Sequence, residues 1–172
     1  MGIREGIILF ETERLKLRTF TLRDAPLIYQ LVNDPEWLKY IGDRHVRTIA
    51  DAEQYLRNGA LKSYMLNGFG PGAVILRETG EPIGMCGLFK RPYLEDVDLG
   101  FAFLPAFRGR GFAFEIASAN LEYAWKELGV ERVMAFTVKE NIASLRLLEK
   151  LGFKDAGEFV LDGESLYLLS IP

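Results

Sequence analysis

The chain has 172 residues, of which 49% are hydrophobic and 26% charged, and its net charge is −3. This is the composition of a globular domain with one core, without the basic excess that nucleic-acid binders usually carry. No secretory leader is expected, nor an apolar run of about 18 residues, the length of a membrane span. We therefore expect one cytoplasmic domain over residues 1–172, with no nucleic-acid and no membrane partner.

One cysteine and one histidine limit the chemistry of the chain. Cys86 has no partner for an internal disulfide and lies in an apolar run, which predicts a small buried core side chain. As a catalytic thiol it would need His45, and these two residue types do not make a metal-ligand cluster. We therefore expect neither a cysteine nucleophile nor a metal site.

Hydrophobic periodicity and turn residues predict strands and helices in an order typical of an α+β protein. This order of strands and helices indicates an α/β mixed-sheet architecture, in which helices cover both faces of one twisted sheet. Residues 37–47 show no clear period and are predicted to be a loop with one helical turn. In chain order, the predicted elements are a strand over 14–20, a helix starting within 21–24 and ending at 33–35, a helix over 48–66, strands over 73–77, 83–89 and 97–104, a helix over 112–128, a strand over 132–138, a helix over 143–151, and strands from 153 and over 166–171.

A glycine turn, residues 108–113 with the sequence Arg-Gly-Arg-Gly-Phe-Ala, joins the strand over 97–104 to the next helix. A helix N-terminus exposes unpaired amide donors and a partial positive charge, and phosphate oxygens satisfy both. Gly109 and Gly111 let the backbone approach an anion, while Arg108 and Arg110 add positive charge. The turn therefore predicts a phosphate site, with ordinary strand-to-helix packing as the alternative.

Two other phosphate motifs match this turn less well. A dinucleotide-binding turn would have a third glycine where Phe114 stands, and an acid at the end of the next strand, where Lys139 is found. A P-loop would continue with Gly-Lys and then Ser or Thr, which this turn does not.

Asn141 lies just beyond the strand over 132–138, at the start of the next helix. Ser144 follows on the same side of the first helical turn. Helix capping alone would account for Asn141. Together with the glycine turn, however, the pair favours a site that binds a pyrophosphate on backbone amides and holds an amide-bearing arm beside it, as coenzyme A requires.

At these residues the chain resembles the GNAT superfamily of acyl-CoA-dependent N-acyltransferases. The phosphate loop of that family is matched by Arg108, Gly111 and Ala113, and its later motif by Asn141 and Ser144, followed by Gly-Phe at 152–153. The run over 12–18 and the Asp-Pro pair at 34–35 resemble the branch that acetylates N-terminal amines of ribosomal proteins. The resemblance implies a mostly antiparallel sheet with a splayed central strand pair.

The resemblance also implies where an acyl-CoA binds, namely where the strand over 97–104 splays from that over 132–138. Amides near Phe103 and Leu104 would bind the pantetheine arm and polarise the thioester carbonyl. Asn141 would hydrogen-bond the arm, with Ser144 beside it, and an amine would attack directly without a covalent enzyme intermediate. The amides implied to bind the pyrophosphate are those of Gly109, Arg110, Gly111, Phe112 and Ala113.

The general acid and the general base of the reaction are matched less well by residues of this chain than the cofactor site is. Leu148 stands where many family members have the tyrosine that protonates the departing thiolate, so water would supply that proton. Asp98 is the candidate base, because it alternates onto the shallow face of its strand with Gly100 and Ala102. A second candidate for catalysis is His45, and the substrate-binding candidates in the same loop are Tyr40, Arg44 and His45.

These features predict an N-acetyltransferase that uses acetyl-CoA as co-substrate and no metal. The amine acceptor would be a protein N-terminus or a small amine such as a polyamine or an antibiotic, and the resemblance suggests a homodimer. An alternative from another functional class is a non-catalytic acyl-CoA sensor on the same fold.

Overall fold

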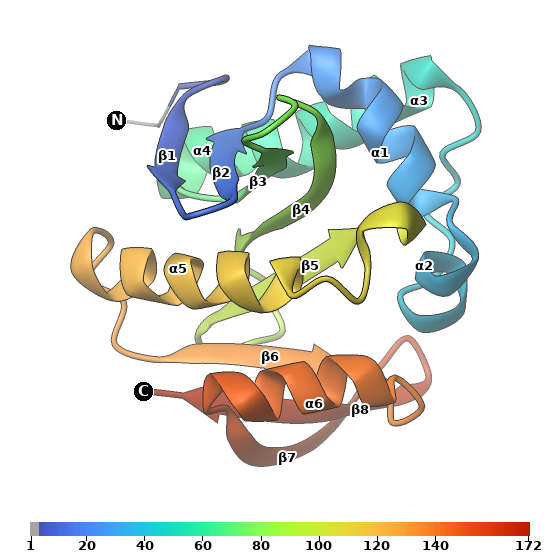
Figure 1. Ribbon diagram of the computed structural model, residues 1–172. Helices are drawn as coiled ribbons and strands as arrows, with labels where there is room; N and C mark the ends of the chain where they lie inside the picture. The colour runs from blue at the N-terminus through green and yellow to red at the C-terminus, as the bar shows by residue number, and fades with distance from the viewer. Residues whose placement is uncertain (1–3) are drawn as a thin grey trace.

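An eight-stranded sheet organises the computed structural model, which describes residues 4–172; residues 1–3 of the N-terminal segment considered above lie outside it (Figure 1). The strand order is β1-β2-β3-β4-β5-β6-β8-β7, and only β5 and β6 run parallel. The predicted mixed, mostly antiparallel sheet is confirmed. The strands are β1 (Ile8–Glu11), β2 (Leu15–Thr19), β3 (Pro71–Leu76), β4 (Pro82–Phe89), β5 (Val97–Phe103), β6 (Val133–Thr137), β7 (Lys154–Leu161) and β8 (Glu164–Ile171).

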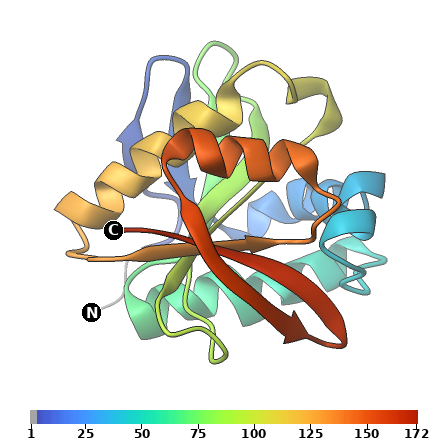
Figure 2. The same cartoon turned by 90° about the horizontal axis from the view of Figure 1, so that it is seen from below.

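Helices cover both faces of this sheet (Figure 2). One face carries α5 (Phe112–Lys126) and α6 (Ile142–Leu151), and the other carries α1 (Ala25–Val32), α3 (Ile49–Leu56) and α4 (Lys62–Asn67). A π-helical turn, Arg57–Leu61, joins α3 to α4, and α2 (Pro35–Tyr40) lies at the end of β5. None of the helices within residues 4–172 combines the length and apolar character needed to cross a membrane.

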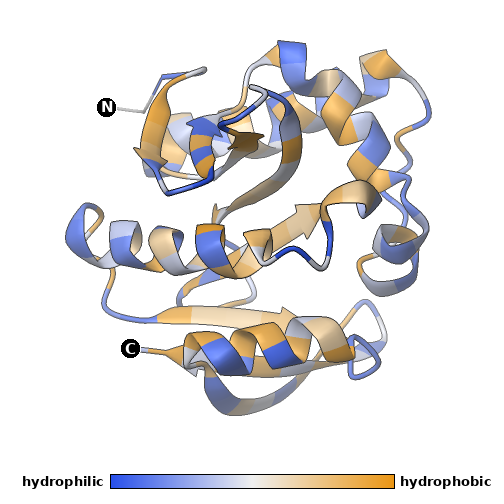
Figure 3. Cartoon of the chain, viewed as in Figure 1, coloured by the Kyte–Doolittle hydropathy of each residue, from blue (hydrophilic) through white to orange (hydrophobic). Residues whose placement is uncertain are grey.

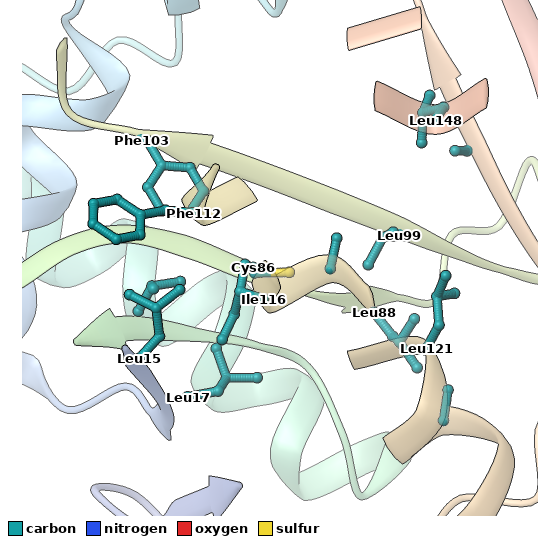
Figure 4. Close-up of a cluster of buried hydrophobic side chains, with 14 of the residues drawn as sticks. Leu15, Leu17, Cys86, Leu88, Leu99, Phe103, Phe112, Ile116, Leu121 and Leu148 are labelled. Atoms are coloured by element: carbon teal, nitrogen blue, oxygen red, sulfur yellow. The ribbon is translucent and has the colours of Figure 1, made fainter. Parts of the chain in front are cut away.

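Two apolar clusters fill the space between the sheet and these helices. In the cluster under α5, the rings of Phe103 and Phe112 lie at one end, with Leu88 and Leu121 at the other (Figure 4). Cys86 belongs to this cluster, as predicted, and is fully buried. Burial raises the pKa of its thiol far above the ordinary value.

The structure adds one strand that the sequence pattern did not predict, because β1 pairs with β2 at the edge of the sheet. The helical turn predicted within the loop over 37–47 is the six-residue helix α2, which begins earlier, at Pro35. Asp34 accepts a hydrogen bond from the Glu36 N–H at 3.1 Å, and Pro35 is the first residue of α2. Asp-Pro thus ends one helix and caps the next, because proline fits the first position of a helix.

The parallel pair β5–β6 is short. The register pairs only Val97 with Val133 and Asp98 with Met134. Beyond these residues the two strands diverge toward the side of the molecule where α2 lies (Figure 1). The backbone groups along the rest of β5 that face β6 therefore lack a strand partner there, as expected from the splayed pair.

Tyr64 of α4 ties two strands together on the other face of the sheet. Its hydroxyl accepts a hydrogen bond from the Phe20 N–H at 2.9 Å and donates one to the Pro71 carbonyl. The side chain is 1% exposed, so water does not compete for these backbone groups.

Replacing Tyr64 by phenylalanine should leave a buried N–H and a buried carbonyl unpaired. We expect Tyr64→Phe to lower the free energy of unfolding by about 1–3 kcal/mol, measured by urea denaturation. The control is Tyr29→Phe, which removes the hydroxyl of a tyrosine that is 37% exposed and should change stability by less than about 0.5 kcal/mol. Equal losses in the two variants would contradict the role of the Tyr64 hydroxyl.

Candidate functional site

A cavity of about 410 Å³ opens where β5 and β6 diverge. Its walls come from α2, the C-terminal half of β5, the glycine turn, the first turn of α5 and one side of α6, with Leu31 added from α1. The side chains around it are mostly aromatic or aliphatic, with a few polar groups, as in small-molecule sites. The lining residues are Leu31, Glu36, Trp37, Tyr40, Ile41, Phe101, Ala102, Phe103, Phe107, Arg108, Gly109, Gly111, Phe112, Ala113, Phe114, Asn141, Ala143, Ser144, Leu147 and Lys150.

The glycine turn presents free backbone donors to this cavity. Gly109 and Gly111 have φ of +71° and +80°, which side chains other than glycine rarely adopt. Gly111 is the N-cap of α5 and has no side chain to cap it, so the amides of the first helical turn keep no protein acceptor. The glycine turn is hydrophilic and lies between the apolar strand β5 and the start of α5 (Figure 3). Such a terminus suits an anionic ligand.

The two arginines of the turn take different roles. Arg108 directs its guanidinium to the other wall of the cavity, 2.5 Å from Asp34 Oδ2 and 3.2 Å from Glu36 Oε2. Its charge is therefore already paired, and the prediction that Arg108 adds charge for a phosphate needs correction. Arg110 is not among the lining residues, but its guanidinium stacks 4.9 Å from the centre of the Phe112 ring.

The backbone amides of Phe103 and Leu104, which were both predicted to bind the ligand arm, point in opposite directions. Leu104 donates its N–H to the Ile83 carbonyl at 2.9 Å, so the assignment of this amide to a ligand is wrong. Because backbone groups alternate in direction along a strand, the N–H and C=O of Phe103 face away from β4, toward the diverging β6. Phe101 has the same orientation, and both residues line the cavity.

Asn141 and Ser144 line the cavity at the start of α6. Asn141 Oδ1 accepts a hydrogen bond from the Ser144 N–H at 3.3 Å, so the oxygen caps the helix. This orientation assigns the capping role to Oδ1 and leaves the amide NH₂ as the donor for a ligand. Leu148, by contrast, is 2% exposed within the core and does not line the cavity.

Asp98 lies at the vertex where β5 and β6 part, but it does not line the cavity. Its side chain is 2% exposed, and Oδ1 accepts a hydrogen bond from Arg91 Nε at 2.8 Å. Burial raises the pKa of Asp98, and the Arg91 charge opposes this rise. The shallow face beside Asp98 is filled by the Phe89 ring, which lies 2.7 Å from where a Cβ at Gly100 would be.

Of the three residues predicted to bind the acceptor, the cavity includes Tyr40. The His45 side chain is 84% exposed, with Nδ1 3.8 Å from Asp43 Oδ2, and Arg44 is also exposed. Neither is brought to the cavity, because the chain after α2 turns outward. Among residues 4–172, moreover, no group of three or more His, Cys, Asp or Glu side chains is placed to hold a metal ion.

The sequence pattern did not identify α2 as a wall of the cavity. Glu36, Trp37 and Ile41 line it from this helix or its end. The available signal was Asp-Pro at 34–35, an N-cap followed by a proline at the first helical position. Helical spacing then places residues 37, 40 and 41 on one side.

Comparisons with known proteins agree with this geometry. The chain matches the acetyltransferase (GNAT) domain family over residues 14–154. It is 32% identical over 148 residues to an uncharacterized N-acetyltransferase, YnaD, of Bacillus subtilis strain 168, covering 86% of this chain and 84% of the relative. A GNAT-family acetyltransferase structure from Bacillus anthracis superposes with a TM-score of 0.77 at 26% identity, covering 94% of this chain and 96% of that one.

A similar fold is found in the ribosomal-protein-S5-alanine acetyltransferase from Vibrio fischeri, with a TM-score of 0.78 at 21% identity over 94% of each chain. At this identity the likeness concerns the fold alone. The family match and the Bacillus subtilis relative together cover most of the chain. The chain therefore belongs to the GNAT family of acetyltransferases.

Proposed function

We propose that this protein transfers an acetyl group from acetyl-CoA to a primary amine by direct attack. The observation that carries the proposal is the cavity at the divergence of β5 and β6, which joins an uncapped helix N-terminus to an unpaired strand edge. The first can bind a diphosphate, and the second can pair with an arm that contains amide groups. Coenzyme A combines both chemical features.

The backbone of the glycine turn binds the diphosphate in this proposal. The amides over 109–113 point phosphate-binding donors into the cavity mouth, and the α5 dipole favours negative charge there. The Arg110 guanidinium lies beside the same turn. Arg108 instead joins the turn to α2 through Asp34, and so supports the opposite wall of the cavity.

The strand edge and Asn141 bind the arm. The Phe101 and Phe103 backbone groups that face β6 supply donors and acceptors, and the Asn141 NH₂ adds a donor from α6. A backbone N–H aimed at the thioester oxygen would stabilise the charge that develops there, an effect worth about 10²–10³ in rate. Tyr40, on α2, lies on the acceptor side of the cavity.

Asp98 remains our candidate base for the acceptor ammonium. Its position at the vertex places it close to the end of the arm, and its raised pKa moves it toward the pH at which proton acceptance is efficient. It would need a water or a shift of the Phe89 ring to reach the amine. The departing thiolate takes its proton from water, since its parent thiol has an ordinary pKa of about 8.5.

Calorimetry with CoA, followed by a screen of amines, tests the proposal. We expect heat of binding with CoA, and release of free CoA from acetyl-CoA with at least one acceptor among peptides with free N-termini, polyamines and aminoglycosides. CoA binding without turnover on any amine would favour the acyl-CoA sensor. Absence of binding to well-folded protein would contradict both functions.

Gly111→Ala should weaken CoA binding by about tenfold or more, because a Cβ at a φ of +80° strains the N-cap and lies 3.3 Å from Arg14 Nη2. The control is Gly129→Ala, at the other end of α5, where φ is +65° and nothing lies within 4 Å of the added Cβ. Both variants carry a similar backbone strain. Calorimetry should show the loss of affinity in Gly111→Ala alone, and similar affinities in the two variants would be inconsistent with the site.

Asp98→Asn should lower kcat by about 10²–10⁴ with little change in the KM for acetyl-CoA, if this carboxylate accepts the proton. The base must be ionised, and burial raises its pKa, so wild-type kcat should fall on the acid side at a pH above the ordinary Asp range. Asp96→Asn is the control, because Asp96 lies just before β5 and pairs at the surface with Arg132, away from the cavity. Unchanged turnover of Asp98→Asn between about pH 6 and 9 would remove Asp98 as the base.

A further inference from the structure

We propose that Arg14 is a positioning residue for the diphosphate site, although it lies between β1 and β2, 96 residues before the glycine turn it touches. Arg14 fixes the peptide plane between Arg110 and Gly111, and so sets the direction of a backbone donor in the glycine turn. This inference rests on the proposed binding of CoA. It states that Arg14, which lies outside the glycine turn, determines the conformation of that turn.

Three contacts hold the Arg14 guanidinium against the glycine turn and the start of α5, and a fourth distance shows how closely it approaches Gly111. Nη1 donates to the Arg110 carbonyl at 2.9 Å, and Nε donates to Glu115 Oε1 at 2.7 Å. The planar group lies 4.5 Å from the centre of the Phe112 ring. Nη2 comes within 3.3 Å of the position that a Cβ at Gly111 would occupy. The guanidinium therefore touches three consecutive residues of the turn and the first turn of α5.

Glu115 anchors this arginine from the helix side. Its Oε2 accepts hydrogen bonds from Thr12 Oγ1 at 2.6 Å and from the Arg14 N–H at 2.9 Å, while Oε1 binds the guanidinium. Both the backbone and the side chain of Arg14 are thus held by one carboxylate. The turn that joins β1 to β2 is fastened to the start of α5, and Arg14 has little freedom to leave the glycine turn.

The contact with the Arg110 carbonyl determines the direction of a donor. In a trans peptide the C=O of one residue and the N–H of the next lie in one plane and point in opposite directions. Holding the Arg110 carbonyl toward Arg14 therefore turns the Gly111 N–H away from Arg14. A Cβ placed on Gly109 would have no other atom within 4 Å, so the surroundings of Gly109 do not fix the turn. Two flexible glycines need such an external contact.

The local charge also favours an anion. Arg14 and Arg110 both lie over the Phe112 ring, at 4.5 Å and 4.9 Å from its centre. Glu115 is the carboxylate that pairs with Arg14, and the Arg110 charge adds to the helix dipole. Because the Arg108 charge is paired with Asp34 and Glu36, and the Arg14 charge with Glu115, the positive charge available to a diphosphate comes from Arg110 and the helix terminus.

The test compares CoA with pantetheine, which has the same arm and thiol but no diphosphate. We expect Arg14→Ala to weaken CoA binding by about tenfold or more in calorimetry and to leave pantetheine binding within about twofold. Arg14→Lys should not restore CoA affinity, because an ammonium cannot hold Glu115 and the Arg110 carbonyl while stacking on a ring. Thermal unfolding identifies any general loss of structure.

Lys16→Ala is the matched control, since Lys16 forms an ion pair with Glu11 at 3.5 Å in the same hairpin. It should bind CoA like the wild type. Wild-type affinity in Arg14→Ala, full recovery in Arg14→Lys, or equal losses for CoA and pantetheine would each overturn the positioning role. Failure of the wild type to bind CoA would instead contradict the proposed function, so the two failures are distinguishable.

Discussion

The early end of the β5–β6 ladder is the constraint on which the rest of the site depends. Backbone N–H and C=O groups in the interior of a sheet need partners, and these strands stop pairing after Asp98 and Met134. The groups beyond that point, at Phe101 and Phe103, are available to a ligand with amide groups. The interior of the sheet thus contains an unpaired strand edge, in addition to the outer strands β1 and β7, and the cavity forms along it. The divergence also brings the N-termini of α5 and α6 to the same opening.

Two long-range contacts then stabilise the glycine turn from opposite sides. On one side Arg108 reaches Asp34, the N-cap of α2, so the turn and the cavity wall formed by α2 are mechanically joined. On the other side Arg14 reaches the Arg110 carbonyl and Glu115, which joins the turn to the first strands. A turn rich in glycine loses much backbone entropy on ordering, and contacts of this kind offset that loss. The N-terminal segment therefore supports the glycine turn, although Arg14 does not line the cavity.

The sequence predicted the turns and helix caps, because these depend on residues that are close together in the chain. The glycine turn and the cap at Asn141 were recognisable because the residue types are required by their own backbone conformations. The contacts of Arg108 and Arg14 were not, since each joins residues far apart in the chain and no residue type requires either partner. The pair of Arg91 and Asp98 spans only seven residues, but it too was not predicted, because it crosses an irregular loop with no repeating pattern. Alternation along β5 predicted that Asp98 shares a face with Gly100 and Ala102, but it could not show that the Phe89 ring fills that face beside Gly100.

The position of the single thiol has a consequence for how the protein coexists with its proposed donor. Thioesters acylate exposed thiolates, and a reactive cysteine near the cavity would compete with the acceptor for the activated group. Cys86 is part of strand β4 and has no exposed surface, and burial raises the pKa of its thiol, so the nucleophilic thiolate is not formed at neutral pH. The enzyme is thereby inert toward self-acylation at sulfur and toward disulfide exchange with the released coenzyme.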